Sequence, residues 1–379
     1  MWLESSAVSG SGTWIWHGEP VTDDAATPTP AEPEIPKLDK KKSIIAGAIT
    51  IVTLIIVFAG ILPKLGNYQA AWASVQAMST MDKAALVVAI IVNLWVYVFP
   101  LMAAIPGLKY KPAFVVRQTS FTISNAVPAG GAVGLGVQYA MLASYKVSSA
   151  AAATGIAITS VWSVFMTLGL PVIGVLLLLI SGENPQQYLT AAILGLVAIV
   201  GAVVVFALIL RSEALARKIG GIGQKLADPI LHRFHKDIDV VQEVVDFRSQ
   251  IVGVVSKHWI SITLSNFGMI FGQFLILFVA IRAVSDGRSS GLTAAEAFAA
   301  FAISRLGTMI PLTPGGLGTV DAALTALLVA FGMDQNDALA ATLVWRACSW
   351  VPQVFLGVFT FLYWRRNAHK VPTAAPETA

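Results

Sequence analysis

Two charged side chains interrupt apolar sequence and are therefore the first candidates for a chemical role. Arg346 lies within Leu343-Val-Trp-Arg-Ala-Cys-Ser-Trp350, and Asp321 opens the apolar segment 322–331. An unpaired arginine near the centre of a membrane helix costs roughly 2.5–3.5 kcal/mol on insertion scales. We therefore expect Arg346 to face protein, water or an anionic ligand. Asp321 is its natural partner, although an acid here would also suit the first turn of a helix.

Asp321 closely follows one of two similar proline- and glycine-rich interruptions. The first reads Asn125-Ala-Val-Pro-Ala-Gly-Gly-Ala-Val-Gly-Leu-Gly136, and the second reads Met309-Ile-Pro-Leu-Thr-Pro-Gly-Gly-Leu-Gly318. In a bilayer, unwound backbone survives only where protein or a water-filled cavity surrounds it. Matched interruptions in the two halves of a chain are a pointer to the binding site of a transporter. The two motifs therefore predict a substrate site between them.

Four further polar residues lie close to these motifs. Arg305 could reach the tip of the second broken segment or extend to the membrane interface. Arg117 could meet a lipid headgroup or be an ordinary interfacial arginine, and Asn125 and Gln138 could join helices or line a cavity. The candidate substrate-binding residues combine these side chains with the small residues of both motifs: Arg346, Asp321, Arg305, Arg117, Asn125, Gln138, Gly130, Gly131, Pro314, Gly315, Gly316 and Gly318.

Motifs of enzymes are absent from the sequence. Gly220-Gly-Ile-Gly-Gln-Lys225 lacks the spacing of a phosphate-binding loop and the Ser or Thr that follows its lysine. His232 and His235 have no further histidine or cysteine near them. We therefore expect no catalytic residue, metal ion, cofactor or nucleic-acid partner, and ATP-driven transport would need a partner protein.

The composition is that of a membrane protein. Hydrophobic residues make up 56% of the chain and charged residues only 12%, about half the charged fraction of a soluble domain. The sequence predicts an all-α polytopic membrane protein with six transmembrane helices and two re-entrant, Gly/Pro-broken helical hairpins. The expected spans are 44–62, 84–106, 148–180, 188–210, 255–281 and 338–364, and the broken segments are 118–145 and 295–333.

Charge predicts the orientation of these spans. With the N-terminus inside, most Lys and Arg residues fall in cytoplasmic stretches, as short cytoplasmic loops require. Both termini are therefore expected in the cytoplasm. Each broken segment could instead cross the membrane twice without changing the sides of the loops, so eight or ten crossings remain open.

The chain divides into a membrane domain and two tails. The proline-rich N-terminal segment is too polar to fold alone, so we expect a disordered cytoplasmic tail. The linker between the halves is expected to be an amphipathic helix on the inner leaflet, or a solvated helical connector. The expected parts are the tail 1–43, the transmembrane domain 44–366 with halves 44–210 and 255–366, the linker 211–254, and the disordered C-terminal tail 367–379.

The two halves share short similarities that indicate an internal repeat. Phe121-Thr-Ile-Ser124 resembles Phe301-Ala-Ile-Ser304, and each precedes its broken motif. With the orientation given above, the units 84–180 and 255–364 point in opposite directions. This favours an inverted repeat with a substrate site near the midplane.

The segment from Arg305 to Arg366 resembles the membrane domain of the lysylphosphatidylglycerol synthase/flippase family. The resemblance rests on Pro314-Gly-Gly-Leu-Gly-Thr-Val-Asp321, on Ala330-Phe-Gly332 and on Arg346, and more weakly on Pro128-Ala-Gly-Gly-Ala-Val-Gly134. The family usually has Glu where this chain has Asp321. The resemblance implies a lipid-translocating module without the aminoacyl-transfer domain of the full-length synthases.

Three functions follow as hypotheses. The first is a flippase of a bacterial inner membrane for a phosphate-containing lipid, whose phosphate Arg346 and Arg305 would hold. The second keeps the fold and moves a polyprenyl-phosphate-linked sugar. The third is a non-transporting scaffold that recruits a lipid or glycan synthase through the N-terminal tail. A homo-oligomer is an open expectation.

Overall fold

The computed structural model describes residues 67–126, 130–181, 186–233, 239–285, 291–309 and 314–368. Within these ranges the chain is all-helical and contains no strand. The expected span 44–62, the tail 1–43, Pro128 and most of the tail 367–379 lie outside the described residues. The predicted all-α class is confirmed for the part that the structure describes.

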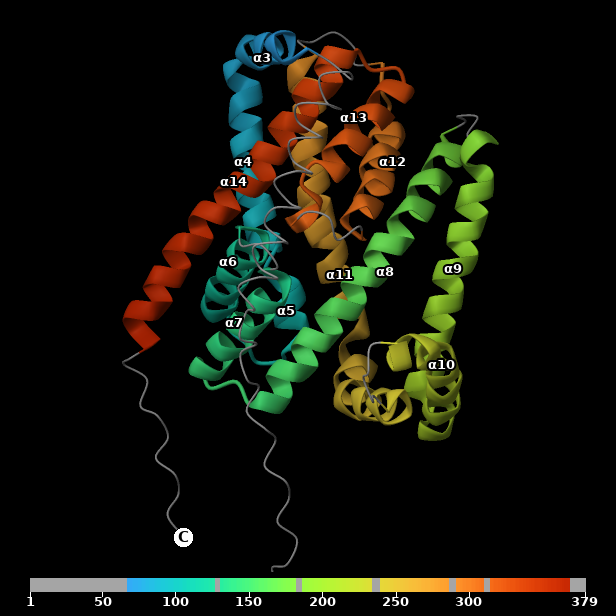
Figure 1. The fold of residues 1–379 in the computed structure, drawn as a ribbon. Helices are drawn as coiled ribbons and strands as arrows, with labels where there is room; N and C mark the ends of the chain where they lie inside the picture. The colour runs from blue at the N-terminus through green and yellow to red at the C-terminus, as the bar shows by residue number, and fades with distance from the viewer. Residues whose placement is uncertain are drawn as a thin grey trace, which may run out of the picture. The chain divides into compact units, whose positions relative to one another are not determined.

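The helices follow one another through short connections (Figure 1). In chain order they are α3 Tyr68–Ala77, α4 Thr80–Val96, α5 Phe99–Ala104, α6 Tyr110–Ala126, α7 Gly130–Ser144, α8 Ser149–Ile180, α9 Gln186–Arg211, α10 Glu213–Arg233, α11 Val240–Val284, α12 Ala294–Ser304, the 3-10 helices η2 Arg305–Met309 and η3 Pro314–Gly316, α13 Thr319–Ala330 and α14 Gln335–Ala368.

Four helical stretches are long and apolar enough to cross a membrane. They are Thr80–Ala104, Ser149–Ile180, Val240–Val284 and Gln335–Asn367, and they correspond to four of the six expected spans. The helix α9 covers the expected span 188–210, of which Ile199–Arg211 is a shorter apolar stretch. The total number of crossings stays a prediction.

Each Gly/Pro motif separates two helices that pack against each other. The pairs are α6 with α7 and α12 with α13. Ala152, near the start of α8, packs with Met141 and Leu142 of α7, whereas Leu178, near the end of α8, packs with Ala299 of α12. The two pairs therefore lie toward opposite ends of α8 (Figure 1). Re-entry of either pair into a membrane stays a prediction.

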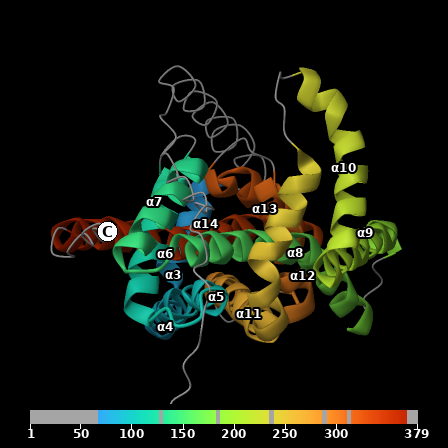
Figure 2. The ribbon, with the colours of Figure 1, turned by 90° about the horizontal axis from the view of Figure 1, so that it is seen from below.

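The linker between the halves differs from the expectation in one respect. The expected amphipathic segment and the expected span 255–281 form one continuous helix, α11, of 45 residues. The helix α10 lies beside the N-terminal part of α11 (Figure 2). The backbone N–H of Val240 donates to Gln224 Oε1 at 2.7 Å, and Gly220 packs directly on Val241. This packing, which hydropathy does not report, makes the two helices a pair.

A close crossing of α6 and α14 joins the first helix pair to the last span. At Gly357 of α14, a Cβ would overlap the backbone carbonyl of Gln118 and the hydroxyl of Thr122. The hydroxyls of Thr119 and Thr360 lie 2.9 Å apart across the same crossing. Small residues allow the backbones of membrane helices to approach in this way.

The Gly357→Val variant should therefore lose about 1–3 kcal/mol of stability, as over-packed cores do. The matched control is Gly253→Val on the exposed face of α11, where an added Cβ would meet nothing within 4 Å. Thermal unfolding of both purified variants in the same detergent measures the difference. Equal unfolding temperatures for the two variants would contradict the tight crossing.

Candidate functional site

A polar cavity of about 300 Å³ lies where α6 meets the helices of the second half. Residues from α6, α8, α11, η2, η3, α13 and α14 line it, together with Tyr97 at the end of α4. Three arginines reach it: Arg117 from α6, Arg305 from the start of η2, and Arg346 from α14. We call this cavity the arginine pocket.

Arg346 forms a buried ion pair with Asp321. Its Nε lies 2.6 Å from Oδ1 of Asp321, whose side chain is only 1% exposed. The other carboxylate oxygen, Oδ2, accepts the backbone N–H of Gly318 at 2.7 Å. Asp321 therefore pairs with the arginine and also satisfies a free N–H at the start of α13, so both interpretations of this acid from the sequence hold together.

Arg305 lies at the end of α12, where the helix gives way to η2. Its Nη1 donates to Gln273 Oε1 at 2.5 Å, and its guanidinium lies 5.4 Å from the ring centre of Phe301. Gln273 in turn accepts the indole N–H of Trp345 on its backbone carbonyl at 3.1 Å. These contacts hold the Arg305 guanidinium in the arginine pocket, which is the first of the two positions left open by the sequence.

Arg117 lines the same pocket from the first half of the chain. Its guanidinium lies 4.5 Å from the ring centre of Tyr97, and its Nη2 lies 3.8 Å from the sulfur of Met269. No acidic side chain pairs with it among the described residues. These contacts place Arg117 in the arginine pocket, and its position relative to a membrane interface stays a prediction.

The arginine pocket has an excess of positive charge and of hydrogen-bond donors. Three guanidinium groups line the pocket and none of its described lining residues is acidic, while Asp321, which is not a lining residue, pairs with Arg346. Five buried N–H groups on lining residues have no acceptor within the described residues; they belong to Arg117 Nε, Arg305 Nε, Arg346 Nη2, Trp350 Nε1 and Gln353 Nε2. An unsatisfied buried donor costs about 1–3 kcal/mol. The pocket therefore suits a ligand that is anionic and rich in acceptor oxygens.

The two Gly/Pro motifs meet at this pocket. Asn125, the penultimate residue of α6, lies against Gly315. A Cβ on Gly315 would overlap the Oδ1 of Asn125. Gly315 has φ of 62°, in the left-handed region that glycine adopts without strain. The Asn125 amide donates to the carbonyl of Phe121 at 2.8 Å, which fixes its orientation. Glycine is required here by conformation and by space together.

Gly315→Ala is accordingly expected to destabilise the protein by more than the roughly 1 kcal/mol that a left-handed non-glycine residue costs, because the methyl group also displaces Asn125. The matched control is Gly131→Ala in the other motif, where an added Cβ meets nothing within 4 Å. That variant should be neutral or slightly stabilising, since alanine favours a helix. Denaturation in detergent separates them, and equal stability would contradict the contact between the motifs.

The other residues predicted for the substrate site pack between helices or shape turns near the arginine pocket. Gln138 is buried between α6 and α7, where Ser120 Oγ donates to its Oε1 at 3.2 Å, and it does not line the arginine pocket. Gly130 packs against carbonyls of α6, and Gly131 is exposed. Gly316 and Gly318 have positive φ and shape the turn before α13. The side chain of Pro314 lies outside the described part.

Sequence reasoning missed the four aromatic members of the pocket, Tyr97, Phe121, Trp345 and Trp350. Tyr97 follows α4 at the break before Pro100, and a proline near a helix end is the one signal that could have drawn notice to it. Trp350 lies on α14 one turn after Arg346, so the helical period could have placed it on the same face.

A comparison with known protein families covers the whole of this site. Residues 44–357 match the family described as the lysylphosphatidylglycerol synthase TM region, and every lining residue of the arginine pocket falls within that range. The UPF0104 membrane protein MJ1078 of Methanocaldococcus jannaschii is 39% identical over 69 residues. These residues are 18% of this chain and 30% of the archaeal protein, so that likeness concerns a minor part of each.

Proposed function

Because this chain belongs to the lysylphosphatidylglycerol synthase TM-region family, we propose that it moves a phosphate-containing lipid across a bacterial inner membrane. Its long apolar helices and its family make it a multi-pass membrane protein. The observation that carries the proposal is the arginine pocket, with three guanidinium groups, one of them paired with Asp321, and five N–H donors that have no acceptor among the described residues. The protein acts in this proposal as a translocase and not as an enzyme.

Phosphate fits these donors for a chemical reason. A guanidinium presents a planar set of N–H groups that match two phosphate oxygens at once, and such charge-assisted hydrogen bonds are strong. Arg346 already uses Nε on Asp321 and keeps Nη2 free for a ligand. Trp350 and Gln353, one and two turns further along α14, add neutral donors to the same oxygens. In this proposal Asp321 orients Arg346.

The position of the pocket supports transport. Both halves of the chain contribute to it, through Arg117 on one side and Arg305 and Arg346 on the other. The helix pairs that end in the two motifs lie toward opposite ends of α8, and the motifs touch at the pocket. We propose that the pairs are re-entrant hairpins of an inverted repeat, with both termini cytoplasmic, so that the pocket lies near the midplane.

Flux of labelled lipid in proteoliposomes tests this function. We expect the wild-type protein to move fluorescent phosphatidic acid or phosphatidylglycerol between leaflets, and to leave a neutral glycolipid of the same chain length in place. The Arg346→Ala and Asp321→Asn variants should be slow. Wild-type rates for both variants, or equal rates for the neutral glycolipid, would refute the assignment.

The charge of the pocket also favours a second cargo, a polyprenyl-phosphate-linked sugar. Three arginines and one carboxylate leave a formal charge of about +2 in a partly buried site, and uncompensated buried charge is costly. A phosphomonoester or a diphosphate neutralises that charge better than a phosphodiester does. An unlabelled polyprenyl diphosphate that inhibits the flux of labelled lipid at a lower concentration than unlabelled phosphatidylglycerol does would favour this cargo.

Deletion of residues 1–43 separates the scaffold hypothesis from the two translocase hypotheses. A translocase without this segment should still move lipid, whereas a scaffold should lose its synthase partner and show no flux in either form. A partner synthase and a homo-oligomer are compatible with all three proposals and are tested by co-purification.

A further inference from the structure

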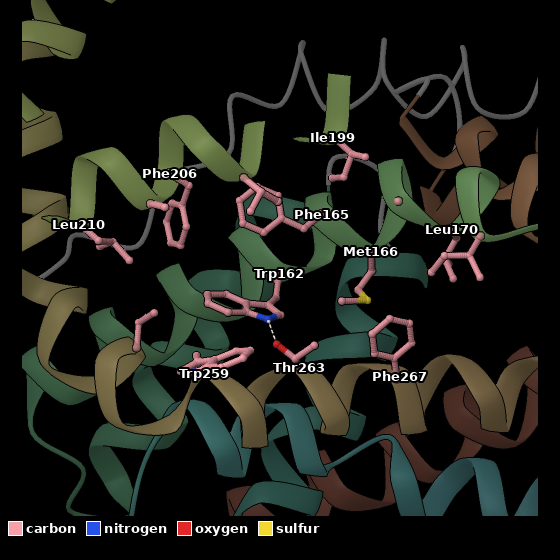
Figure 3. A pocket seen from close by; sticks show the side chains of 15 residues that line it. Trp162, Phe165, Met166, Leu170, Ile199, Phe206, Leu210, Trp259, Thr263 and Phe267 are labelled. Carbon is pink, nitrogen blue, oxygen red and sulfur yellow. Dashed lines mark hydrogen bonds between the residues drawn. The ribbon is translucent and has the colours of Figure 1, made fainter. Parts of the chain in front are cut away.

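A second cavity, of about 430 Å³, lies between α8, α9 and α11 (Figure 3). We call it the aromatic cleft. One face of each helix lines it, because its residues recur every three or four positions. They are Trp162, Phe165, Met166, Gly169, Leu170 and Ile173 on α8, Ile199, Val203, Phe206, Ala207 and Leu210 on α9, and Val255, Trp259, Thr263 and Phe267 on α11. A volume of this size is within the range of sites for small molecules, about 300–1,000 Å³.

The lining offers a ligand almost no polar partner. Of its three polar side-chain groups, the indole N–H groups of Trp162 and Trp259 and the hydroxyl of Thr263, two pair with each other, since Trp162 Nε1 donates to Thr263 Oγ1 at 3.0 Å (Figure 3). Phe206 meets Trp162 and Phe165 edge to face, with ring centres 5.8 and 5.2 Å apart, which makes that wall rigid. Trp259 on the opposite wall is 54% exposed. A hydrocarbon is the class of ligand that this surface can bind.

The length of the cleft fits one lipid chain in one leaflet. Its lining runs from Trp162 to Ile173 on α8 and from Ile199 to Leu210 on α9. At 1.5 Å per residue these stretches are about 17 Å long. The hydrocarbon core of a bilayer is about 30 Å thick, so the cleft spans about half of it.

The aromatic cleft and the arginine pocket share two helices, α8 and α11. Ser163 of α8 and Met269 of α11 line the arginine pocket, while Trp162 and Phe267, one and two positions away, line the cleft. Met269 itself lies 3.8 Å from Arg117. Residues one or two positions apart point to different sides of a helix, so the polar site and the apolar site lie on different sides of α8 and α11 at the same height along them. One amphiphile with its headgroup on one side and a chain on the other would match this arrangement.

We infer that the aromatic cleft holds one hydrocarbon chain of the same lipid whose phosphate binds in the arginine pocket. This inference rests on the proposed function, because it takes its ligand from the phosphate site. It gives the protein a way to bind the chain of its cargo as well as the headgroup, and to prefer long chains over short ones.

Photolabelling tests the inference on the full-length protein in nanodiscs. The probe is phosphatidic acid with a diazirine in the middle of one acyl chain, and labelled peptides are located by mass spectrometry. Labels should appear on the cleft face of α8, α9 and α11. An excess of water-soluble dihexanoyl phosphatidic acid, which carries the headgroup with short chains, should displace them.

Gly169→Leu is the variant that fills the cleft. A Cβ at Gly169 would lie 3.7 Å from Ile199, an ordinary contact, so the helices can accept it while the rest of the side chain occupies the cavity. We expect about a tenfold loss of labelling, the equivalent of two methylene groups left unburied. The control is Gly201→Leu on α9, which is exposed, faces open space and does not line the cleft.

The outcomes separate this inference from the proposed function. Binding of dihexanoyl phosphatidic acid to the wild-type protein, measured by calorimetry, reports on the arginine pocket alone, and its absence would overturn the proposed function and the inference with it. Normal binding combined with cleft labels that neither the short-chain lipid nor Gly169→Leu removes would overturn the inference alone. In that case the cleft holds an ordinary bilayer lipid.

Discussion

The Arg346→Met variant is expected to lose about 3–5 kcal/mol of unfolding free energy. Loss of the Arg346 guanidinium leaves Asp321, which is 1% exposed, as a buried carboxylate without a cation. Removal of one partner from a buried ion pair has a cost of this size. Asp321→Asn should be less damaging, because the side chain of Arg346 is 16% exposed and can retain some hydration. Urea or thermal denaturation in detergent measures both.

The double variant Asp321→Asn/Arg346→Met separates stability from function. Removing both charges should recover most of the lost stability, because no uncompensated charge stays buried. Lipid flux should not recover, since the free Nη2 donor of Arg346 is gone. Recovery of flux together with stability would show that the pair is structural and that the phosphate binds elsewhere.

The Arg117→Gln/Arg305→Gln double variant should bind dihexanoyl phosphatidic acid about 10²–10⁴-fold more weakly. Each hydrogen bond to a charged group contributes about 1.5–3 kcal/mol, and every 1.4 kcal/mol is a factor of ten in affinity. Both side chains line the arginine pocket without an acidic partner in the described structure. Glutamine keeps a polar group in place while removing the charge.

The matched control for this result is Arg282→Gln. Arg282 also stacks on an aromatic ring, with its guanidinium 4.9 Å from the centre of Phe278, but it is exposed and does not line the pocket. Calorimetric titration of both variants at one salt concentration gives the comparison. An equal loss of affinity in the control and the double variant would mean that general charge, and not the pocket, attracts the lipid.

Several features of this protein follow from the sequence alone. The apolar runs determine helices that suit a bilayer, and four of the expected spans reappear as long apolar helices. The cost of a charge in apolar surroundings was enough to connect Arg346 with Asp321, because a buried arginine requires a partner. Glycine and proline marked both helix breaks, since neither residue favours the interior of a helix.

The tertiary structure alone decided which of these features meet. Hydropathy left the position of Arg117 ambiguous, and only the packing of α6 against the second half brings it beside Arg305 and Arg346. Gln138 has the same kind of surroundings in sequence, yet it lies between α6 and α7. The contact of Asn125 with Gly315 and the cleft between α8, α9 and α11 likewise join segments far apart in the chain. Periodicity and hydropathy report on neighbours within one helix, whereas a binding site depends on which faces of different helices pack together.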